Sequence, residues 1–315
     1  MKTARKQHPS LGVFLALSSA LLFGLNASTS KVILEQGVSP GHLVMFRSFV
    51  TALIAGVILA VTKPSAFRVA RAEWKYLLGF GIVGVALMQW AYSNAVLILP
   101  VGIALLIEYT AIVMVPIASW LLFKEKIKTR LWIGVALVLG GLVIVSQIWL
   151  GGLRADGVGF AFLAAALLSV YFIMGEHIQR DRDTMSTLFY SMLIAGFFWF
   201  CATDWWTFDL GSLTQLVNLS GNLDQTFVPL WALLLWLGVM GTFAPMALSY
   251  RSLVHLSASG VGIASTAETV FAFIFGWLWL GEQINGLQTV GGLLVISGIV
   301  IAQTSRVAKE PEFVK

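Results

Sequence analysis

The chain has 315 residues, of which 58% are hydrophobic and 11% are charged, and its mean hydropathy is +0.87. A soluble globular protein carries roughly 25% charged residues, so this composition excludes an ordinary soluble protein, and its apolar character also excludes a disordered chain. We therefore expect most of the surface to face a lipid bilayer. The single cysteine, Cys201, excludes a disulfide framework and a multi-cysteine metal site.

A membrane-spanning helix needs about 20 mostly apolar residues. The chain contains ten such segments, which are, in order, residues 11–29, 43–61, 76–96, 101–123, 130–149, 157–177, 185–203, 229–249, 257–280 and 286–303. One connection is long, residues 204–228, and the others are short. The sequence therefore predicts an all-α membrane protein with ten transmembrane helices.

The distribution of Lys and Arg predicts the orientation in the membrane. Of the 20 basic residues, 17 fall in the two terminal tails and the even-numbered loops. The odd-numbered loops contain only Lys31 and Arg154, and Arg47 lies within a segment. Basic residues are enriched in cytoplasmic loops. We therefore expect a multi-pass protein with both termini in the cytoplasm.

The two halves of the chain repeat each other. An offset of 157 residues aligns Trp120 with Trp277 and Glu125 with Glu282, and it also aligns Gly134 with Gly291 and Gly141 with Gly298. Upstream, an offset of 160 aligns VGIA at 101–104 with VGIA at 261–264, and Glu108 with Glu268. Because five helices per repeat is an odd number, the two copies must enter the membrane from opposite sides. We predict two inverted repeats, residues 1–150 and 151–315, an architecture common among secondary transporters.

The stretches LLFKEKIKTRLWIGVALVLGGLVI (121–144) and LWLGEQINGLQTVGGLLVISGIVI (278–301) resemble the paired signature of the EamA family in the drug/metabolite transporter superfamily. Lys31 at the expected end of the first helix and Arg47 early in the second also match. The resemblance implies a ten-helix inverted-repeat carrier in a bacterial cytoplasmic membrane. It further implies export of small metabolites, often amino acids such as threonine, homoserine or aromatic amino acids, and often by proton exchange.

The sequence departs from the family at one pair of positions. The family often has a proline thirteen residues before each signature glutamate, where this chain has Ile112 and Thr269. Pro116 follows in the first copy only. If the family prolines break the helices around the transport site, this protein must do so by other means.

Three ionisable residues lie inside the predicted membrane segments. By a rise of 1.5 Å per residue, Arg47 and Glu108 lie roughly 6 Å and 10 Å inside the outer edge, and Glu268 lies roughly 16 Å from the cytoplasmic edge. Each costs at least about 2.5–3.5 kcal/mol at a helix centre and by default marks a transport pathway. Arg47 could hold a substrate carboxylate and Glu108 a substrate amine. The alternatives are a static ion pair between them or, for Arg47, extension to the outer interface.

Glu268 has no Lys or Arg nearby in sequence. We predict that it carries the coupling proton, because desolvation favours its neutral form and entering water favours its ionised form. The alternative is a protonated acid that bonds a neighbouring helix. Seven further polar or aromatic residues are candidates for the cavity lining, although ordinary packing would also explain them: Gln89, Trp90, Tyr92, Asn94, Tyr109, Tyr171 and Tyr250. Glu125 and Glu282, at helix ends, are expected to be structural.

These features favour a secondary exporter of a small metabolite, with an amino acid as the leading substrate class and proton antiport as the coupling. Import or exchange of another metabolite is the nearest alternative, and a membrane-embedded enzyme or a non-transporting scaffold are the other classes. The sequence has no GxxxxGK[ST], HExxH or GxSxG motif, so ATP-driven transport and common hydrolase chemistry lack support. The basic residues form no single patch, which argues against nucleic-acid binding. We expect no metal or cofactor, and the partners are the lipid bilayer, the substrate and the proton.

Overall fold

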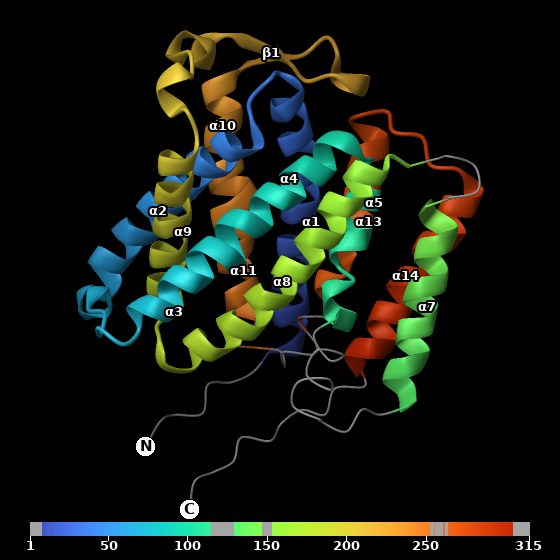
Figure 1. The fold of residues 1–315 in the computed structure, drawn as a ribbon, viewed down its shortest axis with the longest axis horizontal. Helices are drawn as coiled ribbons and strands as arrows, with labels where there is room; N and C mark the ends of the chain where they lie inside the picture. The colour runs from blue at the N-terminus through green and yellow to red at the C-terminus, as the bar shows by residue number, and fades with distance from the viewer. Residues whose placement is uncertain are drawn as a thin grey trace, which may run out of the picture.

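The computed structural model describes residues 8–114, 129–146, 153–252 and 264–304, together with residues 255 and 261. Within these ranges the chain is a bundle of helices with a short β-hairpin at one end (Figure 1). The α-helices are, in chain order, α1 (Pro9–Glu35), α2 (Pro40–Thr62), α3 (Trp74–Gly79), α4 (Met88–Ile98), α5 (Val101–Glu108), α7 (Thr129–Ser146), α8 (Ala155–Asp181), α9 (Thr184–Ala202), α10 (Leu230–Gly238), α11 (Ala244–Ser252), α13 (Ala267–Leu278) and α14 (Gly286–Thr304).

Six helical stretches are long and apolar enough to cross a membrane. They are Pro9–Glu35, Pro40–Thr62, Trp74–Ile98, Ala155–Gly175, Thr184–Ala202 and Leu230–Ser252. Four shorter apolar helical stretches, Val101–Met114, Thr129–Val145, Ala267–Leu278 and Gly286–Ala302, overlap the other four predicted segments. Some residues used in the sequence predictions fall outside the described ranges. These are Trp120 and Glu125 of the repeat alignment and the basic residues of the C-terminal tail. The chain is thus a helical, multi-pass membrane protein, with six of the ten predicted spans seen at full length.

The long connection after α9 corrects the all-α prediction, because it contains an antiparallel hairpin. Strand β1 (Leu216–Asn218) pairs with β2 (Phe227–Pro229), so that Val217 lies opposite Val228. Such β-branched pairs stabilise a two-stranded ribbon, and Ser220 and Gly221 turn the chain with positive φ angles of 62° and 57°. The hairpin lies across one end of the bundle, which we call the hairpin face. Helix α1 begins and α14 ends at the opposite face (Figure 1).

A second difference concerns α1, which runs to Glu35 where the sequence predicted an end near Lys31. Lysine is compatible with a helix interior, and its ammonium group here is paired with Glu282.

Two long helical stretches contain a π-helical segment at their centre. Phe80–Leu87 joins α3 to α4, and Val239–Phe243 joins α10 to α11. A π-helical turn frees backbone carbonyl groups, and side chains bond several of them. Trp199 Nε1 donates to the Ala86 carbonyl oxygen at 3.1 Å. Gly81 and Gly84 also stand 157 residues before Gly238 and Gly241, so both widened segments occupy the same place in the repeat.

Threonines bond the two carbonyl groups just before the second π-helical segment, at the end of α10. Thr242 Oγ1 donates to the Leu237 carbonyl oxygen at 3.1 Å within the same helix. Thr51 Oγ1, from α2, donates to the Gly238 carbonyl oxygen at the same distance.

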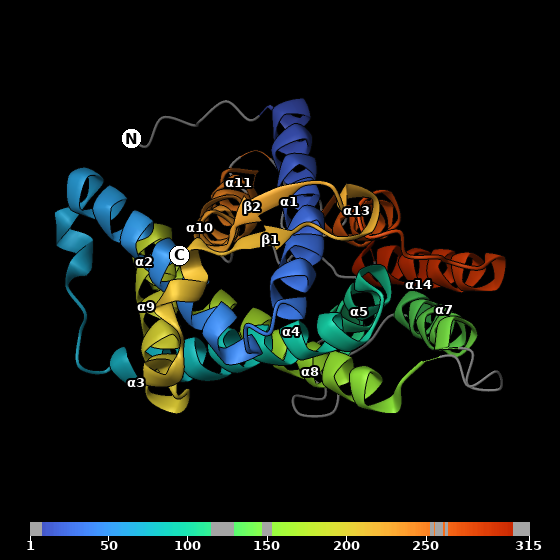
Figure 2. The same cartoon turned by 90° about the horizontal axis from the view of Figure 1, so that it is seen from above.

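Helices α7 and α14 pack closely through four glycines (Figures 1 and 2). A Cβ built on Gly134 would lie 2.7 Å from the Gly298 carbonyl oxygen, and one on Gly141 would lie 2.6 Å from that of Gly291. The reverse contacts are equally short, 2.8 Å for Gly291 and 2.7 Å for Gly298. Small residues of this kind let helix backbones approach closely in a membrane. The contacts pair the glycines in antiparallel order.

The principal core is shared by both halves of the chain. Every residue of α5 is buried, and α5 packs with α4, α7, α8 and α14 in one apolar cluster. It also packs against α13, where a Cβ on Gly102 would lie 2.2 Å from the Phe273 ring. The end of α5 at Glu108 is therefore placed inside the protein, away from bulk water.

Candidate functional site

Two buried charged residues lie near the centre of the bundle. Arg47 of α2 has a relative exposure of 3%, and Glu108, the last residue of α5, has 5%. Each feels the other's charge, yet among the described residues no carboxylate oxygen lies within 4.0 Å of the Arg47 guanidinium. The Arg47 Nε atom is buried and has no hydrogen-bond partner there. The structure therefore lacks the static Arg47–Glu108 ion pair that was one alternative.

The helix carrying Glu108 stops inside the bundle. Regular α-helical bonding ends at Glu108, and Tyr109 and Thr110 form a turn before the chain becomes helical again at Ala111. Tight bonds hold the break: the Thr110 N–H and Oγ1 both donate to the Ile107 carbonyl oxygen, at 3.1 and 2.7 Å. The family often has a proline at the position of Ile112. This chain breaks the helix nearby without one, and the Thr110 side chain stabilises the turn.

The second half has a similar break before Glu268. Residues 264 and 265 are helical, Thr266 is in a turn, and α13 begins at Ala267. Glu268 thus lies in the first turn of α13, where the partial positive charge of the helix end favours a carboxylate. Glu108 lies at the last residue of α5, where the partial negative charge favours a cation. Thr269 stands where the family often has a proline. Its N–H donates to the Thr266 carbonyl oxygen at 3.2 Å, a tight bond at the start of the helix.

One hydrogen bond joins the two breaks. The Tyr109 hydroxyl donates to Glu268 Oε2 at 2.5 Å. Tyr109 is 9% exposed and Glu268 is half-buried. The contact connects the end of α5 in the first half with the start of α13 in the second.

Tyr92 of α4 belongs with these buried polar groups, and Gln89 lies one turn earlier in the same helix. Tyr92 is 7% exposed and feels the charges of Arg47, Glu108 and Glu268. Gln89 is buried, and its Oε1 atom has no partner among the described residues. We call Arg47, Tyr92, Glu108, Tyr109 and Glu268 the central polar cluster.

The remaining cavity candidates make other contacts. Trp90 stacks on Trp199 with ring centroids 5.8 Å apart and meets Phe160 edge-on, and Asn94 Nδ2 donates to the Trp90 carbonyl oxygen at 2.8 Å within its own helix. Tyr171 of α8 stacks on Phe80 and bonds Tyr250 of α11. These contacts fit the packing interpretation better than a lining of the central polar cluster.

The sequence reasoning missed a contact between the halves near the hairpin face. Lys31 Nζ lies 2.7 Å from Glu282 Oε1 and donates to the Leu99 carbonyl oxygen at 3.1 Å. The N–H of Val101, the first residue of α5, donates to both Glu282 oxygens, at 3.2 and 3.0 Å. The opposite charges and the repeated glutamate were visible in the sequence, but they are 251 residues apart and no local pattern pairs them.

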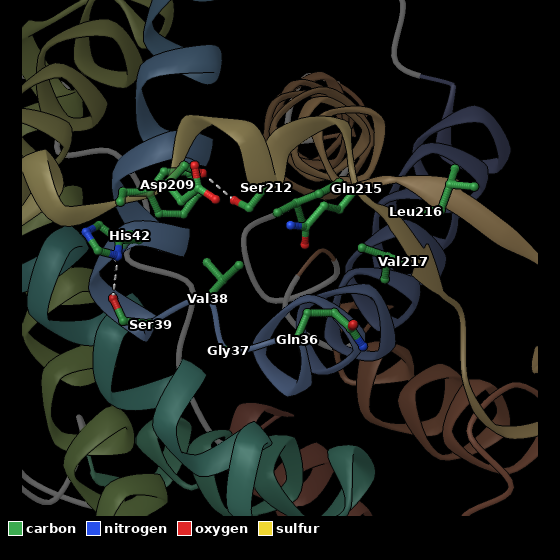
Figure 3. A pocket seen from close by; sticks show the side chains of 12 residues that line it. Gln36, Gly37, Val38, Ser39, His42, Asp209, Ser212, Gln215, Leu216 and Val217 are labelled. Carbon is green, nitrogen blue, oxygen red and sulfur yellow. Dashed lines mark hydrogen bonds between the residues drawn. The ribbon is translucent and has the colours of Figure 1, made fainter.

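Two described pockets lie away from the central polar cluster. The first, of about 360 Å³, opens at the hairpin face between the α1–α2 connection and the segment before β1 (Figure 3). Its walls include His42, bonded to Ser39, and Asp209, bonded to Ser212 (Figure 3). The second, of about 330 Å³, is mainly apolar and lies beside α1 and α10. Neither pocket is lined by Arg47, Glu108 or Glu268.

Comparison with known proteins places the chain among transporters. The EamA-like transporter family model matches twice, over residues 10–147 and 156–304. The chain is 24% identical to an uncharacterized transporter of Bacillus subtilis, YdfC, over 91% of this chain and 90% of that one. It is 22% identical to the threonine/homoserine exporter RhtA of Salmonella typhimurium, over 96% and 94%.

Two further matches agree with this assignment. A probable amino-acid metabolite efflux pump of Escherichia coli is 25% identical over 91% of this chain and 93% of its own. A solved crystal structure aligns with a TM-score of 0.60 at 18% identity, covering 93% of this chain and 96% of that one, and supports the fold alone. The chain belongs to the EamA-like transporter family, within the drug/metabolite transporter superfamily, and is an integral membrane transport protein.

Proposed function

We propose that this protein is a secondary transporter that exports an amino acid, or a related small metabolite, in exchange for protons. The observation that carries the proposal is the central polar cluster, which holds a cation and two carboxylates inside the bundle. Buried charges without a protein partner are strongly unfavourable, so their presence at the junction of two broken helices suits a charged ligand. Two similar proteins are named as exporters of amino acids or their metabolites.

The charges fit the two ends of a zwitterion. The Arg47 guanidinium can bind a carboxylate through two parallel hydrogen bonds. Glu108 can bind an ammonium group, and the negative end of α5 adds to that attraction.

Glu268 is proposed as the proton carrier. It is the carboxylate of the second half, and its bond to Tyr109 of the first half makes its ionisation sensitive to how the halves are arranged. Sealed from water, the carboxyl group retains a proton, and hydration from one side releases it.

We further propose ten transmembrane helices in two inverted repeats, residues 1–150 and 151–315, with both termini cytoplasmic. The antiparallel glycine contacts of α7 and α14 support this arrangement. The contact of Gly134 with Gly298 becomes the contact of Gly291 with Gly141 when the offset of 157 is added to one residue and subtracted from the other. A two-fold axis between the helices produces that reciprocity, and the two π-helical segments follow the same relation.

The test is uptake of radiolabelled amino acids into inside-out membrane vesicles, with and without a pH gradient. We expect gradient-driven uptake of at least one amino acid by the wild type. Glu268→Gln should insert and fold but lose the response to the gradient, because glutamine cannot release a proton, while substrate exchange at equal pH continues.

The matched control is Asp156→Asn, which removes an exposed carboxylate at the start of α8 and should leave uptake unchanged. Gradient-driven uptake by the folded Glu268→Gln variant would remove Glu268 from the coupling step. Transport that runs only toward the cytoplasmic side of the membrane would instead favour an importer.

A further inference from the structure

Glu282 makes contacts that the proposed transport function leaves unexplained. It follows α13 in a non-helical stretch, and its carboxylate contacts α1 through Lys31 and α5 through the Val101 N–H. The side chains of Lys31 and Glu282 are 15% and 12% exposed. A Cβ on Gly276 would lie 2.5 Å from Glu282 Oε2, so the carboxylate also rests against α13.

These contacts hold one end of α5, and the central polar cluster holds the other. Glu282 binds the first N–H of α5, where the helix has a partial positive charge. Glu268, at the opposite end of α13, accepts the hydrogen bond from Tyr109 just past the last residue of α5. The helix that ends in Glu108 is therefore fixed to the second half by two carboxylates.

The Lys31–Glu282 contact lies between the central polar cluster and the hairpin face. Val101 precedes Glu108 by seven residues, or about 10 Å along a helix. The side chains of Lys31 and Glu282 meet the start of α5 here, and both side chains are partly accessible to water. Water can replace such bonds reversibly, which apolar packing does not permit.

The stretch that carries Glu282 is connected to the hairpin. Asn222 Nδ2 donates to the Leu278 carbonyl oxygen at 3.0 Å, and Trp279 Nε1 donates to the Leu219 carbonyl oxygen at 2.9 Å. Gly281 has a φ of +69°, a conformation that other residues rarely adopt. The hairpin thus holds Leu278 and Trp279, and Glu282 follows them just past Gly281.

We infer that Lys31 and Glu282 form the gate that closes the transport pathway on the hairpin face, with Glu282 positioning α5, and hence Glu108, when the gate is shut. Alternating access requires such a closure to open once per cycle. The inference rests on the proposed function. It predicts that loss of either partner exposes residues directly beneath the pair.

The probe for exposure is Ser28→Cys in a Cys201→Ser background, which contains no other thiol. Ser28 lies three residues before Lys31 in α1, on the same helix face. It is 0% exposed, and its hydroxyl has no hydrogen-bond partner among the described residues. The measurement is the rate at which a membrane-impermeant maleimide labels this cysteine in intact cells and in inside-out vesicles.

We expect slow labelling with the gate intact and labelling about tenfold faster from the hairpin face after Lys31→Gln or Glu282→Gln. A hydrogen bond between charged groups shifts an equilibrium by about that factor or more. Glu282→Ala should have a larger effect than Glu282→Gln, because glutamine still accepts the Val101 N–H. The control is Lys63→Gln, which breaks an exposed ion pair with Asp183 and should not change labelling.

A second experiment compares one variant before and after cleavage of a crosslink, so that any loss of stability is common to both measurements. Lys31→Cys with Glu282→Cys, joined by a short cleavable thiol crosslinker, should stop substrate flux, and cleavage should restore it. Full flux through the crosslinked protein, or unchanged Ser28→Cys labelling in every gate variant, would overturn the gate. Either result with wild-type uptake intact leaves the proposed transport standing, whereas absence of transport by the wild type overturns the proposed function first.

Discussion

At the residue scale, the central polar cluster is unusual because its single direct hydrogen bond between ionisable side chains joins the two halves of the protein. Tyr109 and Glu268 are 159 positions apart and meet at 2.5 Å. Arg47, in contrast, has a buried Nε without a partner in the described chain. The bond therefore connects the two halves, whereas the buried Nε of Arg47 has no such partner.

The Tyr109–Glu268 bond can be measured with a double-mutant cycle. Tyr109→Phe and Glu268→Ala should each lower the thermal stability of the detergent-solubilised protein. Their combined effect should fall short of the sum, with a coupling of about 0.5–1.5 kcal/mol, because the same hydrogen bond between neutral groups is lost only once.

The control for this cycle is Tyr190→Phe, which removes a hydroxyl bonded to the Phe67 carbonyl oxygen. Its effect should add to that of Glu268→Ala. Additivity in the Tyr109 cycle as well would mean that the observed contact does not stabilise the protein.

At the element scale, glycine spacing decides how α7 and α14 pack. Four glycines bring the two backbones so close that an added Cβ would meet a carbonyl oxygen at 2.6–2.8 Å. Gly140 of α7 is adjacent in sequence to Gly141, yet a Cβ there would have nothing within 4 Å. The same residue type therefore has opposite importance at neighbouring positions.

Alanine substitutions test this difference. Gly141→Ala and Gly298→Ala should each destabilise the protein by about 1–3 kcal/mol, because overpacking forces the helices apart. Gly140→Ala should be neutral or stabilise by less than about 1 kcal/mol, because alanine is the better helix former. Thermal midpoints in detergent would check both statements, and equal losses at Gly140 and Gly141 would contradict the close packing.

At the scale of the whole molecule, the fold places α1's start and α14's end on the face opposite the hairpin (Figure 1). The even number of crossings that this requires agrees with the proposed ten spans. The excess of Lys and Arg in the tails and even-numbered loops predicts that the face where α1 begins and α14 ends lies in the cytoplasm.

Reporter fusions test this topology. A fluorescent protein joined to the C-terminus should fluoresce, and alkaline phosphatase fused after Gln215, just before β1, should be active, because the enzyme folds only outside the cytoplasm. A dark C-terminal fusion, with the protein present in the membrane, would require an odd number of spans. An inactive phosphatase together with a fluorescent C-terminus would place the hairpin in the cytoplasm.

The sequence was sufficient for those features that depend on composition and spacing. Runs of apolar residues predicted the helices, since a span needs a fixed length of apolar chain, and the paired signature at 121–144 and 278–301 indicated the family that the comparisons confirmed. Buried charges were also predictable, because Arg47 and Glu108 lie within apolar segments and both are buried.

Contacts between distant residues were decided by the tertiary structure alone. The Lys31–Glu282 pair, the Tyr109–Glu268 bond and the hairpin each bring together residues whose own neighbours in sequence give no sign of the partner. The helix break at Tyr109–Thr110 was equally hidden, because a threonine hydroxyl and tight backbone bonds replace the proline that would have marked it. Local pattern determines which segments are helical and apolar, whereas the choice among many possible polar partners depends on how those helices pack.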